Sequence, residues 1–176
     1  MDRIRVVGNA GSGKTTTATA IAHRRGVPRL ELDSVHWLAD WQERDAEEFR
    51  KQVLEFASTH PRWVIDGNYN GRLADRIDHL TDTFVWLDLP RWRIMAALLA
   101  RTVRRSITGE NLWDTNNRER ISSLFSRDQH KNLMLWSWNQ FARNRKRYGS
   151  AAAVGEHRWI RLRSRRAVRR FLENLN

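Results

Sequence analysis

A glycine-rich segment near the start of the chain, GNAGSGKT at residues 8–15, matches the pattern G-x-x-x-x-G-K-[ST] in full. Backbone N–H groups in such a loop point at phosphate oxygens, and the start of the following helix adds positive potential. Lys14 can bridge the β- and γ-phosphates, and Thr15 can offer its hydroxyl to Mg²⁺. The segment therefore predicts a site for ATP, or another nucleoside triphosphate, together with Mg²⁺. The residues expected to hold the nucleotide are Gly8, Asn9, Ala10, Gly11, Ser12, Gly13, Lys14, Thr15 and Thr16.

Three aspartates, Asp33, Asp66 and Asp88, each follow a short apolar run that predicts a strand. A carboxylate at the end of a strand beside the P-loop strand can hold a water molecule of a Mg²⁺ ion near Thr15. From the residues alone, both Asp66 and Asp88 fit that description. A helix cap or a turn is one interpretation of Asp33, and a role toward an acceptor is the other.

The residues after these aspartates exclude two classes of P-loop protein. A motor ATPase normally ends its second carboxylate strand in Asp-Glu, but here Asp66 precedes Gly67 and Asp88 precedes Leu89. A GTPase needs an N-K-x-D guanine-binding motif, which the sequence lacks. Phosphoryl transfer to a bound acceptor remains, a reaction in which the enzyme positions a nucleophile other than water.

Strand-like and helix-like segments alternate along the chain. Strands are expected at 4–7, 29–32, 62–66, 83–88 and 158–162. Helices are expected at 16–25, 45–58, about 71–77, from residue 91, at 129–148 and at 165–175. The segment 106–128 is rich in Asn, Ser, Thr and Arg without clear periodicity, which predicts a mobile insertion. This alternation predicts a parallel, three-layer α/β sheet in a single domain spanning 1–176.

The composition favours a soluble, cytoplasmic protein. The longest purely apolar run, at 94–100, is far shorter than the roughly 20 residues of a membrane span, and a strand beginning at Ile4 leaves no room for a signal peptide. No cysteine is present, so disulfides and thiolate chemistry are excluded. The 176 residues suffice for one sheet covered on both faces.

Positive charge is concentrated in the second half of the chain. Residues 1–90 contain 12 Lys or Arg against 14 Asp or Glu, whereas residues 91–176 contain 20 against 6, giving balances of −2 and +14. This asymmetry indicates an anionic partner, either nucleotide phosphates or a nucleic-acid backbone. A solvated basic surface is the alternative.

Five segments occur in an order that resembles a known group: GNAGSGKT, LELDSVHW, WVIDGNY, FVWLDLPR and WIRLRS. The chain resembles adenylate-kinase-like P-loop proteins, specifically the DNA-topology-modulation proteins, over nearly its whole length. This resemblance implies the fold of nucleoside monophosphate and shikimate kinases, a P-loop NTPase fold with a parallel five-stranded sheet in the order 2-3-1-4-5. It also implies that the insertion at about 106–128 is a lid.

The resemblance assigns the carboxylates to the two halves of a kinase site. It implies that Asp66 rather than Asp88 lies near Thr15, and that Asp33 faces the acceptor. It also places Asn68, Tyr69 and Arg72 where related kinases bind the acceptor, although Asn68 fits a turn equally well. We expect His36 to lie on the surface rather than pair with Asp33.

Arginines follow one stripe of the helix after Pro90. At about 100° per residue, Arg93, Arg101 and Arg104 fall within an arc of roughly 80°, with Arg105 next to it. Such a stripe fits a lid that stabilises charge on the transferring phosphoryl group, although a solvated helix face is the alternative. The resemblance carries Arg101, Arg104 and Arg105 over as catalytic residues.

The basic C-terminal segments carry three further expectations. By analogy alone, Arg163 lies where related proteins run backbone past the adenine. Trp136 and Trp138, near several cations, could stack nucleic-acid bases, but we expect core packing. The cations of the last helix are expected to face water; they are Arg165, Arg166, Arg169 and Arg170.

These observations favour an ATP- and Mg²⁺-dependent phosphotransferase. Lys14 and the loop would hold ATP, Thr15 and Asp66 would organise Mg²⁺, and Asp33 would act on a nucleoside, nucleotide or small hydroxylated acceptor. The alternatives are a nucleotide-controlled nucleic-acid-binding or regulatory protein and a nucleic-acid 5′-end kinase. The sequence does not indicate the oligomeric state.

Overall fold

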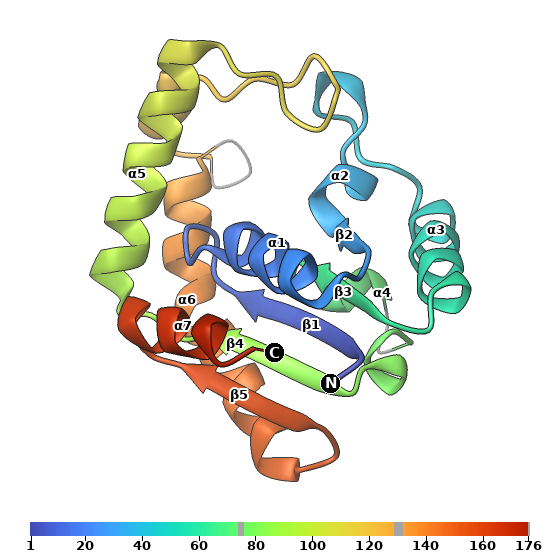
Figure 1. The fold of residues 1–176 in the computed structure, drawn as a ribbon. Helices are drawn as coiled ribbons and strands as arrows, with labels where there is room; N and C mark the ends of the chain where they lie inside the picture. Colours follow the sequence, from blue (N-terminus) through green and yellow to red (C-terminus); the bar gives the residue numbers. More distant parts are fainter. Residues whose placement is uncertain (74–75, 129–131, 176) are drawn as a thin grey trace.

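The computed structural model describes residues 1–73, 76–128 and 132–175. Within these residues, five parallel strands form one sheet: β1 (Arg3–Gly8), β2 (Arg29–Glu31), β3 (Trp63–Asp66), β4 (Thr83–Leu87) and β5 (Arg158–Leu162). Their order is β2-β3-β1-β4-β5, as the resemblance implied. The predicted three-layer P-loop NTPase fold is therefore confirmed (Figure 1).

The helices lie on both faces of the sheet. They are α1 (Lys14–Arg25), α2 (Leu32–His36), α3 (Ala46–Thr59), α4 (Asn70–Leu73), α5 (Arg91–Thr108), α6 (Leu133–Val154) and α7 (Arg165–Glu173). Short 3₁₀ helices are η1 (Ala39–Trp41), η2 (Asp78–Leu80) and η3 (Ile121–Phe125). Helices α1 and α7 cover one face, while α3 and α6 cover different halves of the other (Figure 1). No helix in the described ranges is long and apolar enough to span a membrane.

The strand register brings the carboxyl ends of the strands to one edge of the sheet. Glu31 on β2 pairs with Asp66 on β3, and Gly8 on β1 pairs with Leu87 on β4. Because β1 runs directly into the P-loop, the loop and the strand-terminal carboxylates share this edge. Open α/β sheets bind ligands at this edge, where the strand order reverses.

Several element boundaries differ from the sequence expectations. Strand β2 ends at Glu31, so Asp33 lies in the first turn of α2 rather than at a strand end. Helix α5 continues to Thr108, into the expected insertion, and α6 continues to Val154 through an alanine run that favours helix. The short helix expected at 71–77 is described only as α4, and residues 74–75 and 129–131 lie outside the described residues.

Candidate active site

The P-loop, residues 8–15, has the backbone shape of a phosphate cradle. Gly8, Gly11 and Gly13 have φ angles of +150°, +84° and +89°, which L-residues rarely adopt. At Gly11 the close approach of α5 adds a second constraint, because a Cβ atom would lie 2.7 Å from the carbonyl oxygen of Ile94. Gly13 is the N-cap of α1, so the loop leads into a helix N-terminus that attracts anions.

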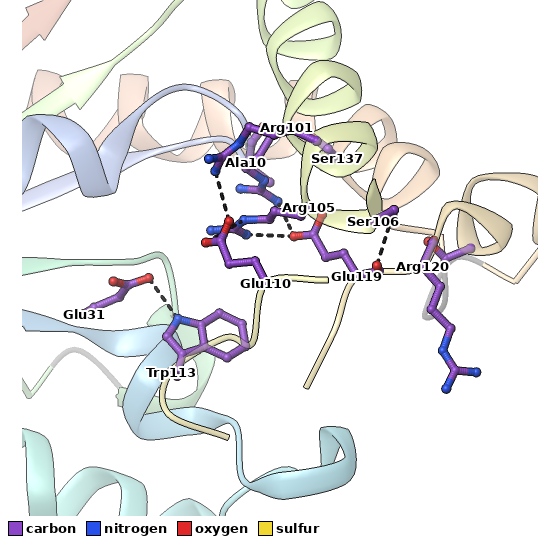
Figure 2. Close-up of polar contacts among 12 residues, drawn as sticks. Ala10, Glu31, Arg101, Arg105, Ser106, Glu110, Trp113, Glu119, Arg120 and Ser137 are labelled. Atoms are coloured by element: carbon purple, nitrogen blue, oxygen red, sulfur yellow. Dashed lines mark hydrogen bonds and ion pairs between the residues drawn. The ribbon is translucent and has the colours of Figure 1, made fainter. Parts of the chain in front are cut away.

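Side chains outside the motif hold the P-loop in this shape. Asn68, just after β3, accepts a hydrogen bond from the Gly8 N–H at 3.3 Å and donates one to the Gly8 carbonyl at 2.7 Å. Ser137 on α6 donates to the carbonyl of Ala10 at 3.2 Å; both residues are labelled in Figure 2. Asn68 thus stabilises the P-loop, a role that the sequence did not indicate.

Two carboxylates affect the pKa of Lys14. Its ammonium donates to the Asn9 carbonyl at 3.1 Å, and Asn144 of α6 holds the Asn9 side chain at 2.6 Å. Burial lowers the pKa of Lys14, whereas the charges of Asp33 and Asp66 act in the opposite direction. Both aspartates therefore lie within electrostatic range of the ammonium.

Thr15 and Asp66 bring two oxygen groups together. The Thr15 hydroxyl donates to Asp66 at 2.9 Å, and Arg29 donates to the other carboxylate oxygen at 2.8 Å. Burial outweighs the Arg29 charge and raises the pKa of Asp66 to about 6. Mg²⁺ at nucleotide sites commonly uses one or two carboxylates, keeps several waters and binds substrate phosphates. The pair fits a Mg²⁺ held by the Thr15 hydroxyl and, through water, by Asp66.

A row of polar contacts leads from Asp66 to the segment after α5. Arg29 lies 3.3 Å from one oxygen of Glu31, and the other oxygen accepts a hydrogen bond from Trp113 Nε1 at 3.1 Å (Figure 2). Arg29 and Glu31 are two residues apart on β2, so their side chains share one face of the strand. Neither residue was among those predicted from the sequence, although opposite charges at alternate positions of a short strand are a signal that could have indicated them.

Asp88 has different partners from Asp66. Its carboxylate accepts hydrogen bonds from Arg161 of β5 at 2.6 and 2.9 Å and lies 3.4 Å from Arg145 of α6. The structure thus places Asp66, and not Asp88, against Thr15, in agreement with the assignment that the resemblance favoured.

Asp33 and Tyr69 meet beside the P-loop. The Tyr69 hydroxyl donates to Asp33 at 2.7 Å. Burial and the Asp33 charge raise the pKa of Tyr69, so the phenol stays protonated and remains a donor. The structure therefore brings together two residues that the sequence placed in separate segments of the acceptor side.

His36 is buried, so its predicted surface position is wrong. Its ring packs against the rings of Trp37, Phe49 and Tyr69, at centroid distances of 4.6, 5.7 and 4.5 Å. The short helix α2 turns this side chain toward α3 because residues three and four positions apart share a helix face. Burial lowers the pKa of His36, and the charge of Arg72 lowers it further.

The arginines of α5 point in two directions. Arg101 and Arg105 share the carboxylate of Glu119, at 3.3 and 2.8 Å (Figure 2). Burial lowers the pKa of Arg101, and Glu119 opposes this effect. Arg104 pairs with Glu110 at 3.2 Å, and its side chain is 64% exposed. The expected single stripe is therefore divided, because residues 101 and 105 lie one turn apart while residue 104 is rotated away.

The lid segment, residues 109–128, contacts the segment that follows α2. The Asn117 side chain accepts a hydrogen bond from the Trp41 N–H at 2.7 Å and donates to the Leu38 carbonyl at 2.8 Å. Non-glycine residues with positive φ occur on both sides, at 40–41 and 113–114. Such conformations cost of order 1–3 kcal/mol each and persist where surrounding contacts fix them. These contacts hold residues 109–128 against the segment after α2.

The other predicted residues are exposed or contact side chains other than those described above. Thr16 and Arg163 are exposed, Arg93 lies over the Trp92 ring at 4.9 Å, and Arg72 pairs with Glu43. The cations of α7 face solvent as expected; they are Arg165, Arg166, Arg169 and Arg170.

The two tryptophans of α6 differ in exposure. Trp138 is 48% exposed and carries the Arg91 guanidinium 3.9 Å from its ring centroid, so the expectation of core packing is wrong for it. Its place on the helix, beside polar residues, turns it outward. Trp136 is half-buried.

Comparison with known proteins finds similarity in structure. No protein-family model and no curated protein matches the chain. A shikimate kinase from Bacteroides thetaiotaomicron matches with a TM-score of 0.54 and 15% identity, covering 99% of this chain and 95% of that chain. A gluconokinase from Sinorhizobium meliloti 1021 matches at 0.52 and 20%, with coverages of 99% and 95%. A protein from Thermus thermophilus matches at 0.56 and 14%, with coverages of 98% and 94%.

The sheet order, the P-loop and these matches define the fold: this chain has the P-loop NTPase fold. Two of the matched structures are kinases by name. Identities of 14 to 20% establish the fold alone, so the reaction has to be inferred from the residues of the site.

Proposed function

We propose that this protein is an ATP- and Mg²⁺-dependent phosphotransferase that moves the γ-phosphoryl group of ATP to a hydroxyl of a bound acceptor. One observation carries the proposal. The Thr15 hydroxyl donates a hydrogen bond to Asp66 at 2.9 Å, directly after the P-loop Lys14, and the charges of Asp33 and Asp66 act to raise the pKa of Lys14. Phosphoryl transfer needs neutralisation of the phosphates and a positioned nucleophile, and these residues offer both.

The nucleotide side neutralises charge. The backbone of residues 8–15 and Lys14 would hold the triphosphate, and Thr15 with Asp66 would hold the Mg²⁺. Bound there, Mg²⁺ would supply positive charge to the phosphate oxygens. On α5, Arg101 and Arg105 would exchange part of their contact with Glu119 of the lid segment for the γ-phosphoryl oxygens.

The acceptor side provides the base. An acceptor hydroxyl would donate its proton to Asp33 while its oxygen forms the new bond to the γ-phosphorus. The bond between that phosphorus and the β–γ bridging oxygen breaks, and ADP leaves with the electron pair. The Tyr69 hydroxyl fixes one Asp33 oxygen and leaves the other for the acceptor.

An acceptor screen tests this proposal. Purified protein with ATP and Mg²⁺ is given nucleosides, nucleotides and hydroxylated metabolites, and ADP formation is measured. The proposal expects that at least one acceptor stimulates ADP formation and that Lys14→Ala removes the stimulation. Stimulation that persists unchanged in Lys14→Ala would exclude a P-loop reaction.

A second candidate function rests on the basic surface. The exposed arginines of α7 and of the second half of α6 favour a nucleic-acid-binding protein controlled by nucleotide, or a 5′-end kinase that combines both activities. This second function predicts DNA or RNA binding that weakens steeply as the salt concentration rises and that changes when ATP is added. Oligonucleotides with a 5′-hydroxyl belong in the acceptor screen, because their phosphorylation would identify the end kinase.

A further inference from the structure

The cations around Asp33 and Lys14 are already paired with carboxylates. Three arginines influence this region: Arg29, Arg72 and Arg101. Arg29 contacts Asp66 and Glu31, Arg72 contacts Glu43, and Arg101 contacts Glu119. An acceptor that carries a carboxylate or phosphate would have to compete with Glu31, Glu43 or Glu119 for one of these partly exposed arginines, a competition that an uncharged acceptor avoids.

Asp33 has no ion-pair partner among the described residues. Its side chain accepts a hydrogen bond from the neutral Tyr69 hydroxyl. The charges of Asp33 and Glu31 both act to raise the pKa of Lys14 and the pKa of Arg101. Once ATP phosphates bind Lys14 and Arg101, Asp33 would face no cation and Glu31 would share Arg29 with Asp66, so the acceptor side would carry an excess of negative charge. That field repels anions and favours hydroxyl or ammonium donors.

Tryptophan rings border the same carboxylates. Trp113 of the lid donates to Glu31 and lies edge-on to Trp41, with ring centroids 5.9 Å apart, and Trp41 lies edge-on to Trp37 at 5.5 Å. The rings come from the lid segment and from the segment after α2, so the contact between these two segments brings them together. Aromatic surfaces combined with a few placed polar groups are typical of small-molecule sites.

From the paired arginines, the two carboxylates and the tryptophans, we infer that the acceptor is a sugar-like hydroxyl compound without a negative charge, either neutral or amine-bearing. The inference rests on the proposed kinase function and adds the charge class of its acceptor. Glu31 and Asp33 are the groups that reject anionic acceptors, and Asp33 additionally receives the proton.

Acceptor pairs that differ in charge test the inference. Several skeletons are used, each as a neutral compound, an amine and an acid or phosphate: glucose, glucosamine, gluconate and glucose 6-phosphate form one such set. We expect the neutral and amine members to exceed the anionic members by about tenfold or more in kcat/KM. A preference for the anionic member of each set would overturn the inference while leaving the kinase proposal intact.

A variant tests whether Glu31 causes this discrimination. Glu31→Gln should reduce the ratio between neutral and anionic members about threefold or more, because it removes one negative charge. Glu47→Gln is the matched control, since the Glu47 side chain on α3 is 79% exposed, and it should leave the ratio unchanged. An unchanged ratio in Glu31→Gln, with normal ATP binding, would overturn the assignment of Glu31.

Binding of a fluorescent ATP analogue separates the two possible failures. Mg²⁺-dependent analogue binding without stimulation by any acceptor in any set would contradict the kinase proposal, and the inference would fall with it. Normal binding with an anionic preference would contradict the inference alone.

Discussion

The two halves of the candidate site are built in different ways. The nucleotide half is a backbone structure: glycines with positive φ, a helix N-terminus, and supports from Asn68 and Ser137. The acceptor half is made of side chains from β2, α2, α4 and the lid, joined by contacts such as Tyr69 to Asp33. A local motif specifies the first half, whereas only the tertiary fold assembles the second. The nucleotide half should therefore tolerate substitution least.

Removal of the P-loop lysine should have the largest effect. Lys14→Ala deletes the ammonium that faces the phosphates, and we expect acceptor-stimulated ADP formation to fall about 10³-fold. The matched control is Lys51→Ala, an exposed lysine on α3, which should retain normal activity. Equal effects of the two substitutions would contradict the claim that the nucleotide half tolerates substitution least.

Two arginines of α5, Arg101 and Arg104, should differ in their effect on activity in the same assay. Arg101→Ala should lower kcat about 10²-fold, because the Arg101 charge acts on the pKa of Lys14 and would stabilise the transferring phosphoryl group. Arg104→Ala is the control on the same helix, and its exposed side chain predicts less than a threefold loss, about what loss of a surface ion pair costs. A larger loss of activity in Arg104→Ala would instead support the expectation from the sequence that the arginines of α5 act together as one stripe.

The two strand-terminal aspartates should differ in their effect on Mg²⁺. Asp66→Asn should weaken the apparent Mg²⁺ affinity about 10- to 100-fold, since it removes the charge next to Thr15. Asp88→Asn should leave Mg²⁺ affinity unchanged and lower stability instead, because it breaks the pair with Arg161. Mg²⁺ titrations of activity, together with thermal unfolding, distinguish these outcomes.

The raised pKa of Asp66 predicts a pH dependence with opposite signs for binding and stability. Mg²⁺ affinity should fall about tenfold per pH unit below about 6, because protonation removes the charge. A raised native pKa means that the folded state holds this proton more tightly. Its contribution to the unfolding free energy of the Mg²⁺-free protein, about 3 kcal/mol, is therefore present at pH below about 4 and lost as pH rises through about 6. Asp66→Asn should abolish both slopes.

Loosening the lid should have the smallest effect. Trp113→Phe removes the hydrogen bond to Glu31 and keeps an aromatic ring, so we expect the acceptor KM to rise about fivefold with little change in kcat. The ATP KM should stay the same, because the nucleotide half does not depend on this contact. A change confined to the ATP KM would contradict the division into two halves.

The sequence predicted the nucleotide half far better than the acceptor half. The glycines at residues 8–15 permit the backbone shape of the loop, so most of its geometry follows from a local motif, and Asn68 and Ser137 add support from other segments. The strand order came from the resemblance, and the register then placed Asp66 beside Thr15.

Predictions for the acceptor half failed where tertiary contacts decide. The burial of His36 depends on Phe49 and Tyr69, which belong to other elements, so the residues around it gave no signal. Likewise, the contact of Trp113 with Glu31 joins residues 82 positions apart. Charge alternation on β2 was the one local feature that pointed to this network.

The central claim is that the P-loop transfers a phosphoryl group to a bound acceptor rather than to water. ATP labelled at the γ-phosphate, incubated with protein, Mg²⁺ and a stimulating acceptor, tests it most directly. We expect the label to appear in a covalent acceptor product in an amount equal to the ADP formed, and we expect neither to form with Lys14→Ala. Label released only as inorganic phosphate, at a rate independent of acceptor, would contradict it.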